Sequence, residues 1–157
     1  MAKFEIDDLK FIETPYTGAR LTVPFTRLQN FGPKHHAIFI GLCDQGEAWI
    51  AELSRRFGHR LVSLTQWLSD NERFVDQIRI HQNTGPLSDQ AVARNAIREV
   101  KNAREQYNLF FNNCENFADR NQIGKTEISP QVKNTLKVLG LVIAGGSIVL
   151  RRALSNR

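Results

Sequence analysis

HHAIFIGLC, residues 35–43, is the most hydrophobic strand-like segment of the chain, and AWIAEL, residues 48–53, follows it after four residues. Both segments are rich in β-branched and aromatic side chains, which favour β-strands. The intervening Asp44-Gln45-Gly46-Glu47 is short and polar and contains a glycine, as is typical of a turn. The stretch therefore predicts an antiparallel β-hairpin.

Weaker strand signals lie on both sides of this hairpin. Upstream, residues 19–26 (ARLTVPFT) are the one β-like run in the first thirty-odd residues, and their Pro24 favours an edge strand or a bend. Downstream, residues 60–64 and 74–80 are strand candidates, with a helical turn over residues 64–68 between them.

The period of the apolar residues changes after residue 86 and predicts helices. Ser88 can cap a helix over about residues 89–106, in which apolar residues recur every three or four positions. A second, short helix is expected over residues 112–121, with Gly124 placed to end it. Ser129-Pro130 opens a third, with serine as the N-cap and proline at the first helical position.

Strands that come first and helices that come last indicate an α+β fold, in which an antiparallel sheet packs against helices. A chain of 157 residues has room for one ordinary domain. We expect that domain over residues 1–128 and a separate C-terminal tail over residues 129–157.

The net charge of +5 comes entirely from this tail. Basic and acidic residues balance at 16 each up to Glu127, and the remaining 30 residues contain five basic residues and no acidic one. A nucleic-acid partner is not expected, because such proteins spread Lys and Arg over a binding surface. The charged N-terminus lacks the apolar core of a signal peptide, so a cytoplasmic protein with two free cysteines is expected.

Cys114 and His35 are the candidate reactive residues. Cys114 lies at the start of the second predicted helix, where free backbone N–H groups and the helix dipole favour a thiolate. His35 begins the most hydrophobic strand, a rigid position from which to present a general base. Taken singly, each has an ordinary alternative: a buried cysteine, which is also the reading for Cys43, and a structural histidine.

Taken together, HHAIFIG and NNCENFAD resemble the two conserved boxes of the lecithin:retinol acyltransferase-like family of permuted papain-like (NlpC-type) thiol enzymes. His35, six residues before Gly41, matches the histidine of the first box. Asn113, Cys114, Glu115 and Phe117 match the second. Ser129-x-Gln131-Val132 before an apolar segment also resembles the family's ending.

The resemblance implies a permuted papain-like fold with Cys114 as nucleophile and His35 as general base, and it implies neither metal nor cofactor. Two positions depart from the family pattern, since His36 stands where Trp is common and Asn116 where His is common. A third departure concerns the residue that orients the imidazole, because the matching position on the next strand is Glu52. A carboxylate can hold an imidazole tautomer. Two substitutes for Glu52 stay open, His59 and His81, and Glu52 could also be an ordinary surface residue.

The tail contains thirteen uncharged residues, 138–150 (VLGLVIAGGSIVL), between Lys137 and Arg151. As a helix they cover about 20 Å, less than the roughly 30 Å of a hydrocarbon core. Flanking cations that reach outward would extend this span, so residues 136–154 are expected to associate with a phospholipid membrane. The alternative is a core helix of the domain.

The expected function is therefore that of a thiol-dependent acyltransferase or phospholipase A-type enzyme that acts on membrane glycerophospholipid through a thioester on Cys114. The lipid substrate comes from the resemblance and the tail, while the residues alone specify only thiol acyl chemistry. A cysteine peptidase or amidase and an inactive interaction module are the rival interpretations.

Overall fold

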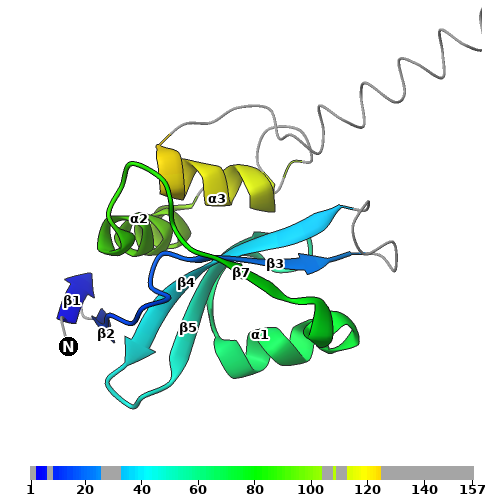
Figure 1. The fold of residues 1–157 in the computed structure, drawn as a ribbon, viewed down its shortest axis with the longest axis horizontal. Helices are drawn as coiled ribbons and strands as arrows, with labels where there is room; N and C mark the ends of the chain where they lie inside the picture. Colours follow the sequence, from blue (N-terminus) through cyan, green and yellow to red (C-terminus); the bar gives the residue numbers. More distant parts are fainter. Residues whose placement is uncertain (1–2, 7–8, 26–32, 104–107, 109–112, 125–157) are drawn as a thin grey trace, which may run out of the picture.

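The computed structural model describes residues 3–6, 9–25, 33–103, 108 and 113–124, and Figure 1 shows their arrangement. Seven strands, three α-helices and one 3₁₀ helix follow one another along this part of the chain. Their bounds are β1 Lys3–Ile6, β2 Leu9–Ile12, β3 Arg20–Pro24, β4 Lys34–Cys43, β5 Ala48–Ser54, β6 Gly58–Ser63, α1 Leu64–Asp70, η1 Glu72–Gln77, β7 Arg79–His81, α2 Asp89–Asn102 and α3 Cys114–Ile123.

The strands form one antiparallel sheet centred on β4. One side of β4 pairs with β5, and β5 pairs in turn with β6. The other side pairs with β3 along the first half of β4 and with β2 near its end. β7 continues the sheet beyond β3, and β1 pairs with β2. The fold is therefore α+β with an antiparallel sheet packed against helices, as the sequence predicted.

Helices cover both faces of this sheet (Figure 1). On one face Ile38 and Ile40 of β4 join a buried cluster with α2 and α3. On the other face Ala37 and Phe39 join a second cluster with Trp67 of α1. Successive side chains of a strand point to opposite faces of the sheet. Neighbouring residues of β4 or β5 therefore pack against different helices.

The predicted hairpin is confirmed as β4 and β5, with Ala37 opposite Glu52. Its register shifts between Phe39 and Gly41, which marks a bulge. Gly41 has a φ of 152°, and a Cβ at this position would lie 2.7 Å from the carbonyl oxygen of Ile12. Only glycine lets β2 approach β4 this closely.

Helix α2 begins as predicted. The Ser88 hydroxyl accepts a hydrogen bond from the backbone N–H of Ala91 at 3.3 Å, and Asp89 adds a negative charge in the first turn. Its apolar face lies on the sheet through Val92, Ala93, Ala96 and Ile97.

Helix α3 also has the predicted boundaries to within two residues. The Asn113 side chain caps it by accepting from the N–H groups of Glu115 and Asn116, both at 3.0 Å. In return, the Asn116 side-chain oxygen accepts from the Asn113 N–H. Gly124 ends the helix in the left-handed conformation. Cys114 is thus the first residue of α3.

Three sequence expectations are corrected. Residues 3–12 form β1 and β2, although only residues 19–26 were expected to be β-like in this region. β3 is not an edge strand, because β7 pairs with it over Arg20–Thr22. Pro24, its last residue, pairs with Lys34 of β4 and lies beyond the residues that pair with β7. Residues 74–77 belong to η1, and only the end of the predicted strand 74–80 is extended, in β7.

Some expectations fall outside the described residues. They concern Asn112, the end of the first predicted helix after residue 103, and the whole tail 129–157 with its third helix. Within the part of the chain that the structure describes, no helix has the length and hydropathy needed to cross a membrane.

Candidate active site

His35 and Glu52 meet on the α1 face of the sheet. His35 is two residues from Ala37 on β4, and Glu52 is two residues from Ile50 on β5. Alternate residues of a strand point to the same face, so both side chains lie on the face that Ala37 and Ile50 share with α1. The imidazole Nε2 of His35 and the Glu52 carboxylate form a buried ion-paired hydrogen bond. Only 4% of His35 and 1% of Glu52 are exposed, so Glu52 is not the surface residue that the alternative interpretation described.

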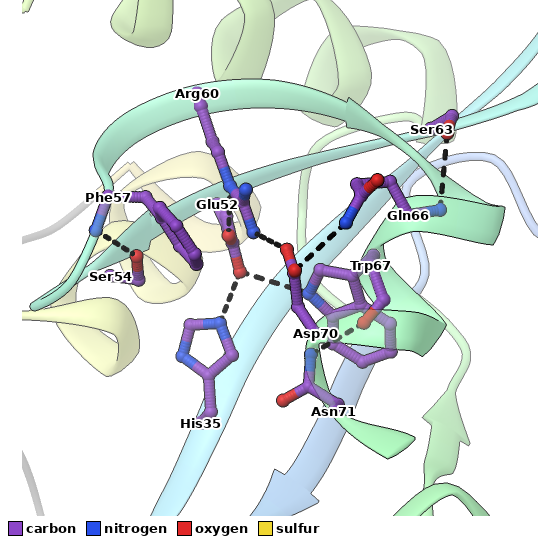
Figure 2. A network of polar contacts seen from close by, with 10 residues as sticks. All are labelled: His35, Glu52, Ser54, Phe57, Arg60, Ser63, Gln66, Trp67, Asp70 and Asn71. Carbon is purple, nitrogen blue, oxygen red and sulfur yellow. Dashed lines mark hydrogen bonds and ion pairs between the residues drawn. The ribbon is translucent and has the colours of Figure 1, made fainter.

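The Glu52 carboxylate is held by two further donors. Arg60 Nε donates to Oε1 at 2.6 Å from β6, and Trp67 Nε1 donates to Oε2 at 3.0 Å from α1. Arg60 also reaches Asp70 at 2.6 Å, which ties the end of α1 into the same network (Figure 2). Burial acts to raise the pKa of Glu52, but His35 and Arg60 outweigh it and lower this pKa. The group is therefore an ionised, oriented carboxylate at neutral pH.

This carboxylate fixes the state of the imidazole. An ionised carboxylate only accepts hydrogen bonds, so Nε2 of His35 carries a proton. That leaves Nδ1 as the ring nitrogen available to Cys114. Burial acts to lower the pKa of His35, but hydrogen bonds and electrostatic interactions with Cys114 and Glu52 raise it to about 9.

Cys114 approaches His35 from the opposite layer of the molecule. As the first residue of α3, it lies against the beginning of β4, where its Sγ is 3.7 Å from the backbone oxygen of Lys34. Its side chain is buried, with 3% exposure, and it interacts with the neighbouring His35 imidazole. The structure thus brings together all three residues singled out in the sequence.

His36 serves another network and stays neutral. Its Nδ1 accepts a hydrogen bond from Arg20 Nε at 2.7 Å, and Arg20 also pairs with Asp119 of α3 at 2.7 Å. Burial, together with the positive charge of Arg20, lowers the pKa of His36 to about 2. This network links the sheet to α3 and contains neither Cys114 nor Glu52.

The two substitute histidines lie elsewhere. His59 on β6 approaches Glu99 of α2 at 3.6 Å, and its ring packs edge-on against Phe117. His81 is exposed on β7 and contacts the hydroxyl of Thr22 at 3.1 Å. Neither of these contacts involves His35.

Cys43 lies at the other end of β4 from His35. A strand rises about 3.3 Å per residue, so roughly 25 Å separate the two cysteines, far beyond the span of a disulfide. Both thiols are free. Burial acts to raise the pKa of Cys43, but backbone hydrogen bonds with Gln45 and Glu47 lower it.

A pocket of about 320 Å³ opens beside His35 and Glu52. Its wall comes from the ends of β3 and β5, the β5–β6 turn, Arg60 of β6, the end of α1 and η1. Cys114 is not part of this wall, so His35 stands between the pocket and the thiol. The residues that line it are Pro24, Phe25, His35, Glu52, Ser54, Arg55, Arg56, Phe57, Arg60, Asp70, Asn71, Arg73 and Phe74.

The sequence did not single out Arg60, Trp67 or Asp70. Arg60 lies directly opposite Glu52 in the β5–β6 pairing, so a correct prediction of that hairpin's register would have identified it. Trp67 and Asp70 lie on α1, three residues apart, and no local sequence pattern relates them to Glu52.

In the described part of the chain, no group of three His, Cys, Asp or Glu side chains is arranged to bind a metal ion. Comparison with known proteins found no matching family model, and neither a curated protein nor a solved structure matched the chain.

Proposed function

We propose that the chain is a thiol-dependent acyltransferase or phospholipase on a permuted papain-like fold, with membrane glycerophospholipid as the acyl donor. The observation that carries this proposal is the buried series Cys114, His35 and Glu52. A thiol at a helix start, an imidazole that hydrogen-bonds it and a carboxylate that orients the imidazole are the parts of a nucleophilic acyl-transfer site.

In the resting site, His35 carries a proton beside the Cys114 sulfur. A pKa of about 9 keeps the imidazole protonated at pH 7. An imidazolium next to a cysteine is the arrangement that activates the nucleophile in thiol enzymes. Glu52 stabilises the imidazolium and keeps Nδ1 directed away from itself. The pair needs no external base.

The reaction then proceeds in two balanced steps. The Cys114 sulfur bonds to the ester carbonyl carbon, the carbon–oxygen bond breaks, and the Nδ1 proton of His35 passes to the departing alcohol oxygen. In the second step water, or an alcohol or amine acceptor, attacks the thioester and gives its proton to His35 as the carbon–sulfur bond breaks. Free Cys114 and the acylated acceptor result.

The start of α3 offers a donor for the oxyanion. Asn113 occupies the N–H groups of Glu115 and Asn116, whereas the N–H of Cys114 has no partner among the described residues. A free backbone N–H on the nucleophile itself lies close to where negative charge develops on the carbonyl oxygen.

The choice of lipid as substrate rests on the family resemblance and on the basic apolar tail. The tail is expected to keep the enzyme at a bilayer, where long-chain esters are concentrated. A cysteine peptidase of the same fold would use the same three residues on an amide bond.

The test is intact-mass measurement after the full chain is mixed with phosphatidylcholine vesicles. We expect an acyl-sized increment on Cys114 that persists in the Cys43→Ser variant and disappears in the Cys114→Ser variant. Equal losses from both variants would reject Cys114 as the nucleophile. An adduct with a peptide ester but none with lipid would assign the site to peptidase chemistry.

A further inference from the structure

The wall of the pocket beside His35 contains arginines that do not belong to the ion-pair network of Glu52. Its wall contains four arginines and two carboxylates, a net charge of +2 before any charge on His35. Both carboxylates bind the same arginine, because Glu52 and Asp70 each pair with Arg60 at 2.6 Å. The other three arginines form no salt bridge with the carboxylates of this wall.

These three are Arg55, Arg56 and Arg73, and all are exposed residues of the pocket wall. Among the described residues, none of them forms a salt bridge. Burial acts to raise the pKa of Asp70, but hydrogen bonds with Arg60 and Gln66 lower it, and the positive charges of Arg60 and Arg56 add to this effect. Arginine is the side chain best suited to bind phosphate, because its planar guanidinium offers paired N–H donors.

Aromatic side chains lie among these arginines. Phe25 and Phe57 are 52% and 40% exposed on the wall of the same pocket. The guanidinium of Arg56 lies 4.8 Å from the Phe57 ring centre, and that of Arg73 lies 5.7 Å from the Phe74 ring centre. An apolar surface beside cations suits a ligand with an anionic group joined to a hydrophobic body.

From this charge and shape we infer that the pocket binds the phosphate headgroup of an anionic glycerophospholipid, with Arg55 and Arg73 as specificity-determining residues. The inference deepens the proposed function and rests on it for the lipid nature of the substrate. A volume of about 320 Å³ is at the lower end of small-ligand sites, which suits a small headgroup such as phosphatidic acid. His35 lines the pocket, so a headgroup bound there lies beside the catalytic imidazole.

The test measures binding separately from turnover. The full chain with Cys114→Ser is titrated calorimetrically with three soluble probes: dihexanoyl phosphatidic acid, dihexanoyl phosphatidylcholine and inorganic phosphate. We expect phosphatidic acid to bind at least tenfold more tightly than either of the other two. Adding Arg55→Gln and Arg73→Gln should weaken phosphatidic acid binding by about tenfold or more, as for the loss of charged hydrogen bonds, and change phosphatidylcholine binding less than twofold.

The matched control is Arg98→Gln in the same background. Arg98 is an exposed arginine on α2 that does not line the pocket, so its replacement should leave all three affinities unchanged. Circular dichroism establishes that each variant is folded.

Several results would overturn the inference. Equal affinity for the two lipids, an unchanged preference in the double variant, or no binding by any probe would each reject the pocket as an anionic-lipid site. Inorganic phosphate bound as tightly as phosphatidic acid would make it a free-phosphate site instead. A wild-type chain that forms no thioester while the binding preference holds would reject acyl transfer alone.

Discussion

At the scale of single residues, Glu52 has the most demanding position in the site, because its carboxylate accepts from His35, Arg60 and Trp67 at once. Glu52→Gln places an amide NH₂ among three donors and removes the charge that stabilises the imidazolium. We expect the acylation rate to fall about tenfold or more. We also expect the free energy of unfolding to fall by about 1–3 kcal/mol, as for a buried polar group that loses its hydrogen-bond partners. Stopped-flow acylation and urea unfolding measure the two effects.

Asp70→Asn is the matched control for this change. It also removes a carboxylate from Arg60 but leaves Glu52 and its contact with His35 in place. We expect a small loss of stability and a nearly unchanged acylation rate. If Asp70→Asn lowered the rate as much as Glu52→Gln, the whole charge network, rather than the orienting carboxylate, would be required.

His35 predicts a pH dependence of stability. Its pKa is raised from 6.5 to about 9 in the folded protein, so the folded state binds the proton more tightly than the unfolded state. The resulting stabilisation is fully present below pH 6.5 and is lost as pH rises through about 9, with a total on the order of 3 kcal/mol. Urea unfolding between pH 6 and pH 10 should show this decline in the wild type.

The control for this prediction is His35→Gln, which should show a clearly flatter profile over the same range. The contribution of Glu52 to stability depends on pH in the opposite direction. Because its pKa is lowered in the folded protein, this contribution is present above pH 4.5, the ordinary pKa of the group, and is lost at more acid pH. Identical alkaline profiles for wild type and His35→Gln would show that His35 is not the titrating group.

The partly exposed Cys43 affects how the nucleophile is tested. Burial acts to raise its pKa, but backbone hydrogen bonds with Gln45 and Glu47 lower it, and the free thiol is partly accessible to alkylating reagents. Cys114, by contrast, is buried. A competition between the two thiols therefore measures access more than catalytic activation, and Cys114 is best assayed in the Cys43→Ser background.

At the scale of secondary structure, the bulge in β4 determines how β2 joins the sheet. Gly41→Ala adds a methyl group 2.7 Å from the carbonyl oxygen of Ile12, at a φ that alanine rarely adopts. We expect the free energy of unfolding to fall by about 3 kcal/mol, from backbone strain and overpacking together. Chemical denaturation measures the change.

Gly46→Ala isolates the steric part of that effect. Gly46 has a φ of 80° in the β4–β5 turn, but nothing lies within 4 Å of an added Cβ. Its replacement should lower the free energy of unfolding only by the cost of a left-handed backbone conformation for alanine, about 1–2 kcal/mol. Equal losses at both positions would show that β2 can move away from β4 without further cost.

The sequence predicted the elements whose signals are local. The β4–β5 hairpin, the Ser88 cap and the Gly124 terminus depend on patterns within a few residues of one another. β1 and β2 were missed because each has only four residues, too few for a clear strand pattern, and because β2 joins the sheet through the distant β4. Pro24 suggested an edge strand, since a sequence does not show how far along β3 the pairing of β7 extends.

The same distinction applies to the candidate site. Cys114 and His35 were found from their positions at element starts and from the resemblance, whereas the burial of Glu52 depends on α1 covering that face of the sheet. Arg60, Trp67 and the cationic pocket come from β6, α1 and η1, whose arrangement around Glu52 no local pattern specifies.

At the scale of the whole molecule, membrane association remains a prediction from the sequence alone. Residues 136–154 lie outside the described residues, and their thirteen uncharged residues flanked by cations are the basis for it. Truncation before Leu136 should release the protein from anionic vesicles and lower activity on bilayer lipid. Activity on a short-chain soluble ester should survive, because Cys114, His35 and Glu52 are all upstream. Vesicle co-sedimentation and ester hydrolysis measure the two effects.

A charge variant separates electrostatic from apolar binding. Replacing Lys137, Arg151 and Arg152 by Gln should weaken vesicle binding by about 1 kcal/mol per charge, and the loss should shrink at high salt. A truncated chain that unfolds while vesicle binding is unchanged would assign the segment to the core of the domain instead.

Cys43 and the candidate site lie at opposite ends of β4, so a label on Cys43 can report how the molecule is oriented at a membrane. In the Cys114→Ser variant Cys43 is the single thiol of the chain, and a fluorophore attached there lies roughly 25 Å from His35, next to the β4–β5 turn. Energy transfer from that fluorophore to labelled lipid reports how far this end of the sheet stands from a bilayer. A chain that docks with this arginine-lined pocket against the lipid would hold the fluorophore away from the membrane, whereas a chain that lies on its side would bring the fluorophore near.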